Sequence, residues 1–384
     1  MKSIDNAYVI WLGSVFNDSS VELEDAISPA GNKWQLRFIR SLINDRNIEV
    51  FSFGHKPKRA FPCGPLFVSG DISCTPNDLK QSLAWYFNIP YIRNIFTNLL
   101  VVSSIIKLLI KQKKRPHAVI TYNIYSYNFL AALVCRFLFF IKWIAVVADP
   151  INDRTDKYNP LLKLSNGTVY LSKHLYNQSK AINKLHIEGG VEVFDSEDKN
   201  SGDYTGTKYI LYTGRVTKHN GIDLLLDAFK LVPDPSLHLI VTGKCEDVVA
   251  RRFLSRGERV VYKGVVSEVE LQQLYRNATI CVNPRLIGDK TNTSIFPSKL
   301  LEYLSYYKPI VSTYTPGISE EYTEVIKFVY EDSPEKLASL IGEVVNWDEE
   351  MVVQNTARVK RFVSNFKTWE RMTANFWRWL LTIK

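Results

Sequence analysis

Cysteine is too scarce and too scattered in this sequence to support a covalent framework. The 384 residues include five cysteines, an odd number without paired spacing, at positions 63, 74, 135, 245 and 281. Disulfide-stabilised secreted domains and zinc clusters both need paired or closely spaced cysteines. The sparse pattern argues against both classes and predicts a reduced, cytoplasmic setting.

A secretory leader and a clean membrane-crossing run are also missing. The first 20 residues hold no sustained apolar stretch of the kind that a signal peptide needs. A spanning helix requires about 20 apolar residues. Arg136 and Lys142 interrupt Phe129–Ala148, and Ile95–Ile110 contains Lys107 and falls short of that length. Neither segment is therefore predicted to cross a membrane.

The segment Ile95–Ile110 has a second feature, a run of cations at its end. Four more basic residues follow it, namely Lys111, Lys113, Lys114 and Arg115. A basic amphipathic helix of this kind can lie on an anionic membrane surface. An ordinary helix with a solvated basic end fits the same residues, so both interpretations stay open.

Charge is unevenly distributed along the chain. Residues 1–190 carry 23 Lys and Arg against 13 Asp and Glu, a net of +10, whereas the rest carries 25 against 26, a net of −1. The basic half is predicted to meet an anionic partner, either nucleic acid or a membrane surface. No basic helix interleaved with aromatics and no nucleic-acid motif is present, which argues against nucleic acid.

Apolar runs alternate with amphipathic stretches in two halves, and 384 residues are too many for one ordinary core. The alternation predicts parallel strands with helices on both faces, repeated in two domains. The polar stretch 195–208 is a plausible linker. Strands are predicted at Tyr8–Leu12, Ile48–Phe53, Ala118–Thr121, Trp143–Ala148, Thr168–Ser172, Tyr209–Tyr212, Leu237–Thr242, Val260–Tyr262, Ile280–Asn283, Pro309–Ser312 and Phe328–Tyr330. Helices are predicted at Lys33–Asn44, Asn128–Phe140, Leu224–Leu231, Leu271–Arg276, Ser298–Tyr306 and Pro334–Val345.

The fold class is thus α/β, with two Rossmann-like domains facing each other across a cleft. Ligands bind such sheets at the carboxyl ends of the strands. We assign residues 1–190 to the first domain and 205–368 to the second. The tail WERMTANFWRWLLTIK, residues 369–384, places its aromatic residues largely at helical spacing.

The stretch YTGRVTKHNGIDLLLDAF, residues 212–229, has the order strand, glycine, arginine, loop and helix. This order suits phosphate binding, because a glycine admits close approach, an arginine supplies a planar fork of donors and a helix start adds N–H groups. A plain turn with a surface arginine is the alternative for this stretch alone.

A second such stretch is NPRLIGDKTNTSIFPSKLLEYLSYYKPIVST, residues 283–313. Pro297 suits the first position of a helix, and the N–H groups of Phe296 to Lys299 would form a second anion site. Glu302 follows about one turn later, where its carboxylate could accept hydrogen bonds from a ribose diol. A solvated helix residue is the alternative for Glu302.

Together, the two stretches resemble the family 4 glycosyltransferases, retaining enzymes of the GT-B type. The resemblance runs through most of residues 209–345, including LHLIVTGK and YEDSPEKLASLI, and is closest to the branch of bacterial surface-polysaccharide assembly. In the first half it is limited to KHLYNQ (173–178), EGGVEVF (188–194) and SPAGN (28–32). SPAGN stands where the family has its glycine-containing first loop, which makes Gly31 a substrate-binding candidate.

The resemblance implies roles for individual residues. Gly214 and Arg215 would line the donor diphosphate, Glu302 would hold the ribose, and the backbone around Val265 would meet the base. The remaining substrate-binding candidates are Lys218, Ser294, Phe296, Pro297 and Ser298. The tail is predicted to pack back on the N-terminal domain, as in resembling enzymes.

Two positions depart from the family pattern. Asn220 stands where a lysine is usual, with Lys218 two residues earlier, and Ser294 stands in place of the first of two glutamates. Lys299 is predicted to supply the missing phosphate charge, and it is a catalytic candidate with Arg215. No Asp-x-Asp pair is present, so no metal ion or other cofactor is expected.

Asp149 follows the apolar strand of the first half and is the third catalytic candidate, either toward the acceptor or donor sugar or as a plain helix cap. For Tyr122, Asn123 and His174, which end or follow neighbouring strands, a structural role is favoured. The loop Arg285–Ile295 is predicted to select the donor sugar.

The sequence therefore predicts a metal-independent, retaining hexosyltransferase in polysaccharide biosynthesis. It would use a UDP- or GDP-linked sugar and a glycan or lipid-linked acceptor. It would be cytoplasmic, with the inner face of the plasma membrane as a candidate location and an anionic membrane surface as a candidate partner. The alternatives are a nucleotide-sugar epimerase, a non-catalytic nucleotide-sugar-binding relative and, less favoured, a nucleic-acid-binding protein.

Overall fold

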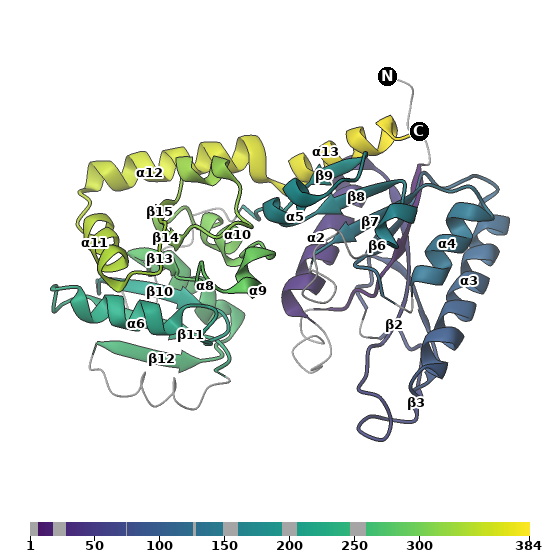
Figure 1. The fold of residues 1–384 in the computed structure, drawn as a ribbon, viewed down its shortest axis with the longest axis horizontal. Coiled ribbons are helices and arrows are strands. Elements are labelled where there is room, and N and C mark those ends of the chain that lie inside the picture. The colour runs from purple at the N-terminus through teal and green to yellow at the C-terminus, as the bar shows by residue number, and fades with distance from the viewer. Residues whose placement is uncertain are drawn as a thin grey trace. The chain divides into compact units, whose positions relative to one another are not determined.

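The chain divides into two compact units in a computed structural model. The structure describes residues 7–17, 28–73, 75–125, 128–148, 160–193, 206–245 and 259–384. The N-terminal unit comprises Met1–Gly190 together with Trp369–Lys384, and the C-terminal unit comprises Val191–Thr368 (Figure 1). Asp149 and most of the predicted linker lie outside the described residues.

A seven-stranded parallel sheet forms the centre of the N-terminal unit (Figure 1). Its strands, in spatial order, are β4 (Lys80–Ala84), β2 (Glu49–His55), β1 (Tyr8–Leu12), β6 (Val119–Tyr122), β7 (Trp143–Val147), β8 (Gly167–Tyr170) and β9 (Lys184–His186). Thr168–Ser172, the last strand predicted in this half, corresponds to β8, but β9 follows it at the edge of the sheet, and β4 was missed as well. Both β4 and β9 are edge strands with polar or charged residues, so neither has the apolar run of a buried strand.

The helices of this unit are α2 (Pro29–Arg46), α3 (Ile92–Gln112), α4 (Phe129–Phe137) and α5 (Lys173–Gln178), with a 3₁₀ turn, η2, at Leu162–Leu164. A small antiparallel ribbon pairs β3 (Phe67–Val68) with β5 (Tyr86–Phe87). Ser28 caps α2 by accepting a hydrogen bond from the Gly31 backbone N–H at 3.3 Å. Gly31 therefore lies in the first turn of a helix, which corrects its expected place in a loop.

Helix α3 is longer than the sequence indicated. Its 21 residues make it, by length and composition alone, apolar enough to cross a membrane, the one such helix among the described residues. This corrects the expectation that the segment falls short of a span. The expectation took only Ile95–Ile110, whereas the helix includes one more turn at its N-terminal end.

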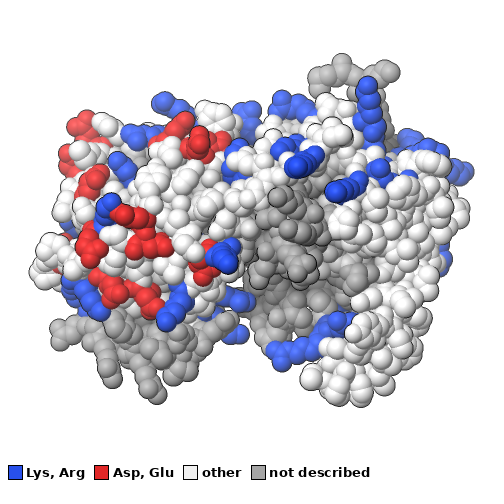
Figure 2. All heavy atoms as spheres, viewed as in Figure 1, with Lys and Arg blue, Asp and Glu red and all other residues white. Residues whose placement is uncertain are grey.

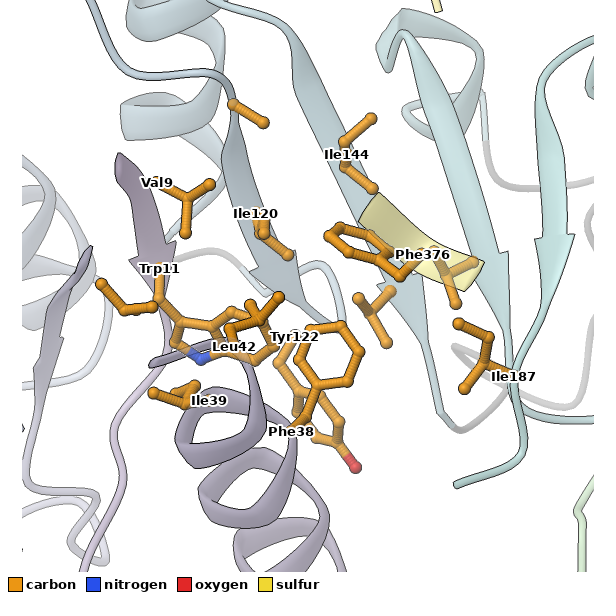
Figure 3. Packing of buried hydrophobic residues seen from close by; sticks show 14 of the residues in the cluster. Val9, Trp11, Phe38, Ile39, Leu42, Ile120, Tyr122, Ile144, Ile187 and Phe376 are labelled. Atoms are coloured by element: carbon orange, nitrogen blue, oxygen red, sulfur yellow. The ribbon is translucent and has the colours of Figure 1, made fainter. Parts of the chain in front are cut away.

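The last helix, α13 (Trp369–Thr382), belongs to the core of the N-terminal unit. The Phe376 ring lies 5.1 Å from that of Phe38 on α2, and the Thr373 and Ser41 hydroxyls are 2.8 Å apart. Figure 3 shows Phe376 among buried side chains of the sheet, including Ile120 and Ile144. The end of the chain thus completes the unit in which the chain begins.

A six-stranded parallel sheet forms the centre of the C-terminal unit. Its strands, in spatial order, are β12 (Val260–Gly264), β11 (His238–Thr242), β10 (Tyr209–Thr213), β13 (Ile280–Asn283), β14 (Ile310–Thr313) and β15 (Lys327–Val329). The helical elements are α6 (Ile222–Leu231), α8 (Glu268–Asn277), α9 (Lys290–Thr293), α10 (Lys299–Leu304), η3 (Glu320–Glu324), α11 (Pro334–Val345), α12 (Glu349–Phe362) and the π-helical turn η4 (Val363–Lys367).

The strand order confirms the predicted fold class of two Rossmann-like units. From β10, the chain moves outward through β11 and β12, then returns to place β13, β14 and β15 on the other side. This order creates a switch point between β10 and β13, and ligands of open α/β sheets bind at the carboxyl ends beside it. In the N-terminal unit the corresponding switch point lies between β1 and β6. The cleft expected between the units stays a prediction.

Candidate functional site

Two glycines bring together the loops at the switch point of the C-terminal unit. Gly214, directly after β10, has a φ of 124°, and Gly221, at the start of α6, has a φ of 78°. A Cβ atom on Gly221 would lie 1.7 Å from the Pro284 carbonyl oxygen. Only glycine permits this contact, so the first predicted stretch is pressed directly against the second.

Hydrogen bonds join the same two loops. The His219 carbonyl accepts from the Asn292 side chain at 2.6 Å, and the Asn220 side chain donates to the Arg215 carbonyl at 2.9 Å. Asn220 is buried, so the residue that replaces the usual lysine shapes the loop from inside. Arg215 and Lys218 are exposed on this loop.

Lys299 and Glu302 lie beside Gly214 and connect the second stretch to the first. The Lys299 ammonium is 2.7 Å from Glu302 Oε2, and its Cε lies 3.4 Å from where a Cβ on Gly214 would stand. Both side chains are partly exposed, at 31% and 26%. A cation and a carboxylate are therefore held next to a glycine turn, at the edge where parallel sheets bind ligands.

Tyr275 on α8 forms a hydrogen bond to the Glu302 carboxylate. Its hydroxyl donates to Glu302 Oε2 at 3.0 Å and lies 2.8 Å from the hydroxyl of Thr213, the last residue of β10. Burial, and then the negative charge of Glu302, raise the pKa of Tyr275. The phenol therefore stays protonated and remains a hydrogen-bond donor.

The remaining predicted residues of this unit lie around the same edge. Val265 directly follows β12 and is 74% exposed, and Ser294 ends the short helix α9. Phe296 and Pro297 are buried, whereas Ser298 is exposed. Helix α10 begins at Lys299, two residues after Pro297, and has six residues. The helix thus begins two residues later than Pro297 suggested, and the anion site expected at the N–H groups of Phe296 to Lys299 stays a prediction.

Sequence reasoning missed residues that hold the loop Arg285–Ile295. The Asp332 carboxylate accepts from the backbone N–H groups of Ile287 and Gly288 at 2.8 and 3.0 Å. The Arg285 guanidinium donates to the Asn292 side chain at 3.3 Å, and burial lowers the pKa of Arg285. Asp332 and Tyr275 lie within the stretch that carries the family resemblance, but only the tertiary contacts show what they hold.

Neutral polar groups surround the switch point of the N-terminal unit. The Asn32 side chain makes two 2.9 Å hydrogen bonds to the Phe16 backbone, and Asn123 Oδ1 accepts from the Ala148 N–H at 2.8 Å. A Cβ on Gly31 would lie 3.2 Å from the Tyr122 hydroxyl, so these two residues meet at this edge. His174 is the second residue of the short helix α5, and burial lowers its pKa.

The C-terminal unit matches a known family. Residues 207–346 match the family model described as "Glycosyl transferases group 1". That segment includes Gly214, Arg215, Lys299 and Glu302. No curated protein matches the sequence.

Solved structures share the fold over nearly the whole chain. A glycosyltransferase from Rickettsia africae is 12% identical, with a TM-score of 0.72 over 99% of this chain and 100% of that one. Anabaena Alr3699/HepE in complex with UDP and glucose is 12% identical, with a TM-score of 0.65 over 98% and 100%. The lipopolysaccharide outer core galactosyltransferase WaaB is 14% identical, with a TM-score of 0.65 over 98% and 99%. The family match and these neighbours together support a GT-B glycosyltransferase.

Proposed function

We propose that the chain is a retaining glycosyltransferase that moves a hexose from a UDP- or GDP-linked donor to a lipid-linked glycan acceptor in polysaccharide biosynthesis. The observation that carries the proposal is the convergence of Gly214, Lys299 and Glu302 at the switch point of the C-terminal unit. The Anabaena neighbour, which holds UDP and glucose, supports the donor class, and the galactosyltransferase WaaB supports the setting.

In the proposed complex the donor diphosphate lies beside Gly214 and the Lys299 side chain, which stands over that glycine. Arg215 and Lys299 supply positive charge to the phosphates, with Lys218 nearby on the exposed loop. Glu302, fixed by Tyr275, accepts hydrogen bonds from the ribose, while the backbone beside Val265 meets the base. The segment that precedes Lys299 consists of Phe296, Pro297 and Ser298. Ser294 belongs to the loop that contacts the sugar.

The chemical step breaks the bond between the anomeric carbon and the diphosphate oxygen, while the acceptor hydroxyl oxygen bonds to that carbon and passes its proton to the departing diphosphate. Negative charge grows on the departing diphosphate, so fixed cations pointed at it lower the barrier. We assign this role to Arg215 and Lys299. Since no metal ion is required in this scheme, a chelator is expected to leave turnover unchanged.

We assign acceptor binding to the N-terminal unit, including Gly31 and Asp149. The amides of Asn32 and Asn123 fix the loops at its switch point through hydrogen bonds to the backbone, and we assign the contacts with the neutral hydroxyl groups of a glycan to these loops. A lipid-linked acceptor places the reaction in the cytoplasm at the inner face of the membrane.

The test is incubation of the full chain with UDP-glucose, UDP-galactose and GDP-mannose, following thermal unfolding and release of free nucleoside diphosphate. A donor at about 100 times its Kd should raise Tm by about 5 °C and be slowly hydrolysed. Lys299→Ala and Glu302→Gln are the matched site variants. Stabilisation without hydrolysis would favour a non-catalytic binder. Interconversion of UDP-glucose and UDP-galactose would favour an epimerase. Stabilisation by an oligonucleotide alone would exclude the proposal.

A further inference from the structure

Helix α3 is apolar on two sides, and only one of them packs against the rest of the N-terminal unit. Val101, Ile105 and Leu108 are buried in a core cluster against the sheet. A second stripe, at helical spacing, points outward: Ile95 is 63% exposed, Leu99 57% and Ile110 73%. A helix on the surface of a soluble domain normally presents polar residues on its outer face. The outer stripe of α3 therefore requires a separate explanation.

The exposed apolar surface continues on both neighbours of α3. On one side, the Trp85 ring lies 4.7 Å from Phe96 of α3, and Phe87 of the β3–β5 ribbon lies 6.3 Å from the same ring. On the other side α4 packs beside α3 and leads to Phe140, which is 76% exposed. We call Ile95, Leu99, Ile110, Trp85, Phe87 and Phe140 the α3 patch. A patch built from three elements is larger than scattered surface residues produce.

The segment that supplies all six residues of the α3 patch carries charge of one sign. From residue 79 to residue 148 the sequence has nine Lys and Arg and no Asp or Glu. Five of these cations, at Lys107, Lys111, Lys113, Lys114 and Arg115, are exposed along the last turns of α3 and just beyond. In Figure 2 the side of the N-terminal unit that carries α3 and α4 is mostly uncharged and edged by Lys and Arg, whereas the acidic groups in view lie on the C-terminal unit.

We propose that the α3 patch binds the surface of an anionic lipid bilayer, with α3 lying along the interface. A bilayer offers an apolar layer directly beneath anionic headgroups, which matches large apolar side chains bordered by lysines. Nucleic acid would satisfy the cations but not the aliphatic stripe. A second copy of the same patch would bring the same positive charge and be repelled.

The packing of α3 also distinguishes an interfacial position from a spanning one. To cross the bilayer, α3 would have to leave the sheet and expose the core contacts of Val101, Ile105 and Leu108. Lying flat, it keeps those contacts and inserts only Ile95, Leu99 and Ile110. The proposal goes beyond the proposed function, because lipid binding is measured with neither donor nor acceptor present.

The experiment is flotation of the purified full chain with vesicles of phosphatidylcholine, with and without phosphatidylglycerol. One variant carries Ile95→Ser, Leu99→Ser and Ile110→Ser, and another carries Lys111→Glu, Lys113→Glu and Lys114→Glu. Matched controls lie on α12 of the C-terminal unit: Met351→Ser, Val352→Ser and Val353→Ser for the apolar set, and Arg358→Glu, Lys360→Glu and Arg361→Glu for the charged set. Thermal unfolding verifies that every variant is folded.

We expect binding to vesicles that contain phosphatidylglycerol, weakened about tenfold or more by each α3 variant and little changed by either control. Added salt should weaken vesicle binding by the wild type, whereas vesicle binding by the charge variant should fall little further. Brominated acyl chains should quench part of the tryptophan fluorescence, and Trp85→Phe should remove that part.

Three results would overturn the proposal. The first is equal flotation with and without phosphatidylglycerol, and the second is flotation that no α3 variant reduces. The third is a concentration-dependent dimer abolished by the apolar variant, which would make the α3 patch a contact between copies of the chain. Failure of sugar transfer with intact flotation would count against the proposed function alone.

Discussion

The two units share the order of six strands, to which the N-terminal sheet adds β9 at one edge, and they differ in the side chains at the switch point. Beside β10 and β13 stand two positive-φ glycines, Lys299 and the Glu302–Tyr275 pair. Among the described residues beside β1 and β6, the corresponding groups are neutral amides and hydroxyls such as those of Asn32 and Asn123. Under the proposed function, the same backbone plan binds an anionic donor in one unit and a neutral acceptor in the other. Function resides in these side chains rather than in the fold.

The units also differ in how they are completed, since the N-terminal unit takes its last helix from the far end of the chain. Phe376 is fully buried. Phe376→Ala should cost about 3–5 kcal/mol of the free energy of unfolding, because a large ring leaves a cavity. Urea unfolding of the full chain measures this. Phe366→Ala, at an exposed ring of the C-terminal unit, is the control and should cost under about 1 kcal/mol. Equal costs would show that α13 is not part of the core.

The charges at the C-terminal switch point should matter mainly in the chemical step. Arg215→Ala and Lys299→Ala should each lower kcat by about 10²–10³, the usual effect of removing one donor to a developing anion. Lys218→Ala should have a smaller effect, because Lys299 already occupies the position beside Gly214. Steady-state kinetics with the preferred donor measure all three. Equal, mild losses would contradict the assignment of charge stabilisation.

Acid should weaken the N-terminal unit through His55. Burial, and then the nearby Arg93 charge, lower the pKa of His55 to about 4. The unfolded chain, with an ordinary pKa near 6.5, takes up a proton first as the pH falls. Stability is therefore complete above about pH 6.5 and declines toward pH 4, by about 2 kcal/mol at pH 5. Urea titrations across this range should show the slope, and His55→Gln should reduce it. An unchanged slope in the variant would assign the acid sensitivity to other groups.

The smallest effects are expected at Glu302, which we propose holds the ribose, and at its partner Tyr275. Glu302→Gln should raise KM for the donor about tenfold with less change in kcat, because the hydrogen bond is present before and during the reaction. Tyr275→Phe should raise KM several-fold, since it removes a donor to Glu302 Oε2 without removing the carboxylate. A fall in kcat alone would place these residues in the chemical step instead.

Most of the secondary structure was readable from local pattern, but the edge strands β4 and β9, helix α12 and the start of α3 were missed. The predicted bounds are correct for Tyr8–Leu12, Ile280–Asn283 and Pro334–Val345, because the spacing of apolar residues identifies buried strands and amphipathic helices. The edge strands β4 and β9 lack such spacing and depend on their neighbours for hydrogen bonds. Helix α3 was shortened in the prediction because its N-terminal turn includes Arg93 and Asn94.

The sequence by itself determined that the chain forms two α/β domains, and it identified the two stretches that hold Gly214, Lys299 and Glu302. Only the tertiary structure decided that Lys299 stands over Gly214 and that Tyr275 holds Glu302, because these contacts join residues on separate strands and helices. It also decided that Asn220 turns inward and that α3 keeps an apolar stripe outside. Composition and spacing specify which side chains exist and along which element they repeat. Which face of an element is covered depends on the packing of neighbours distant in sequence.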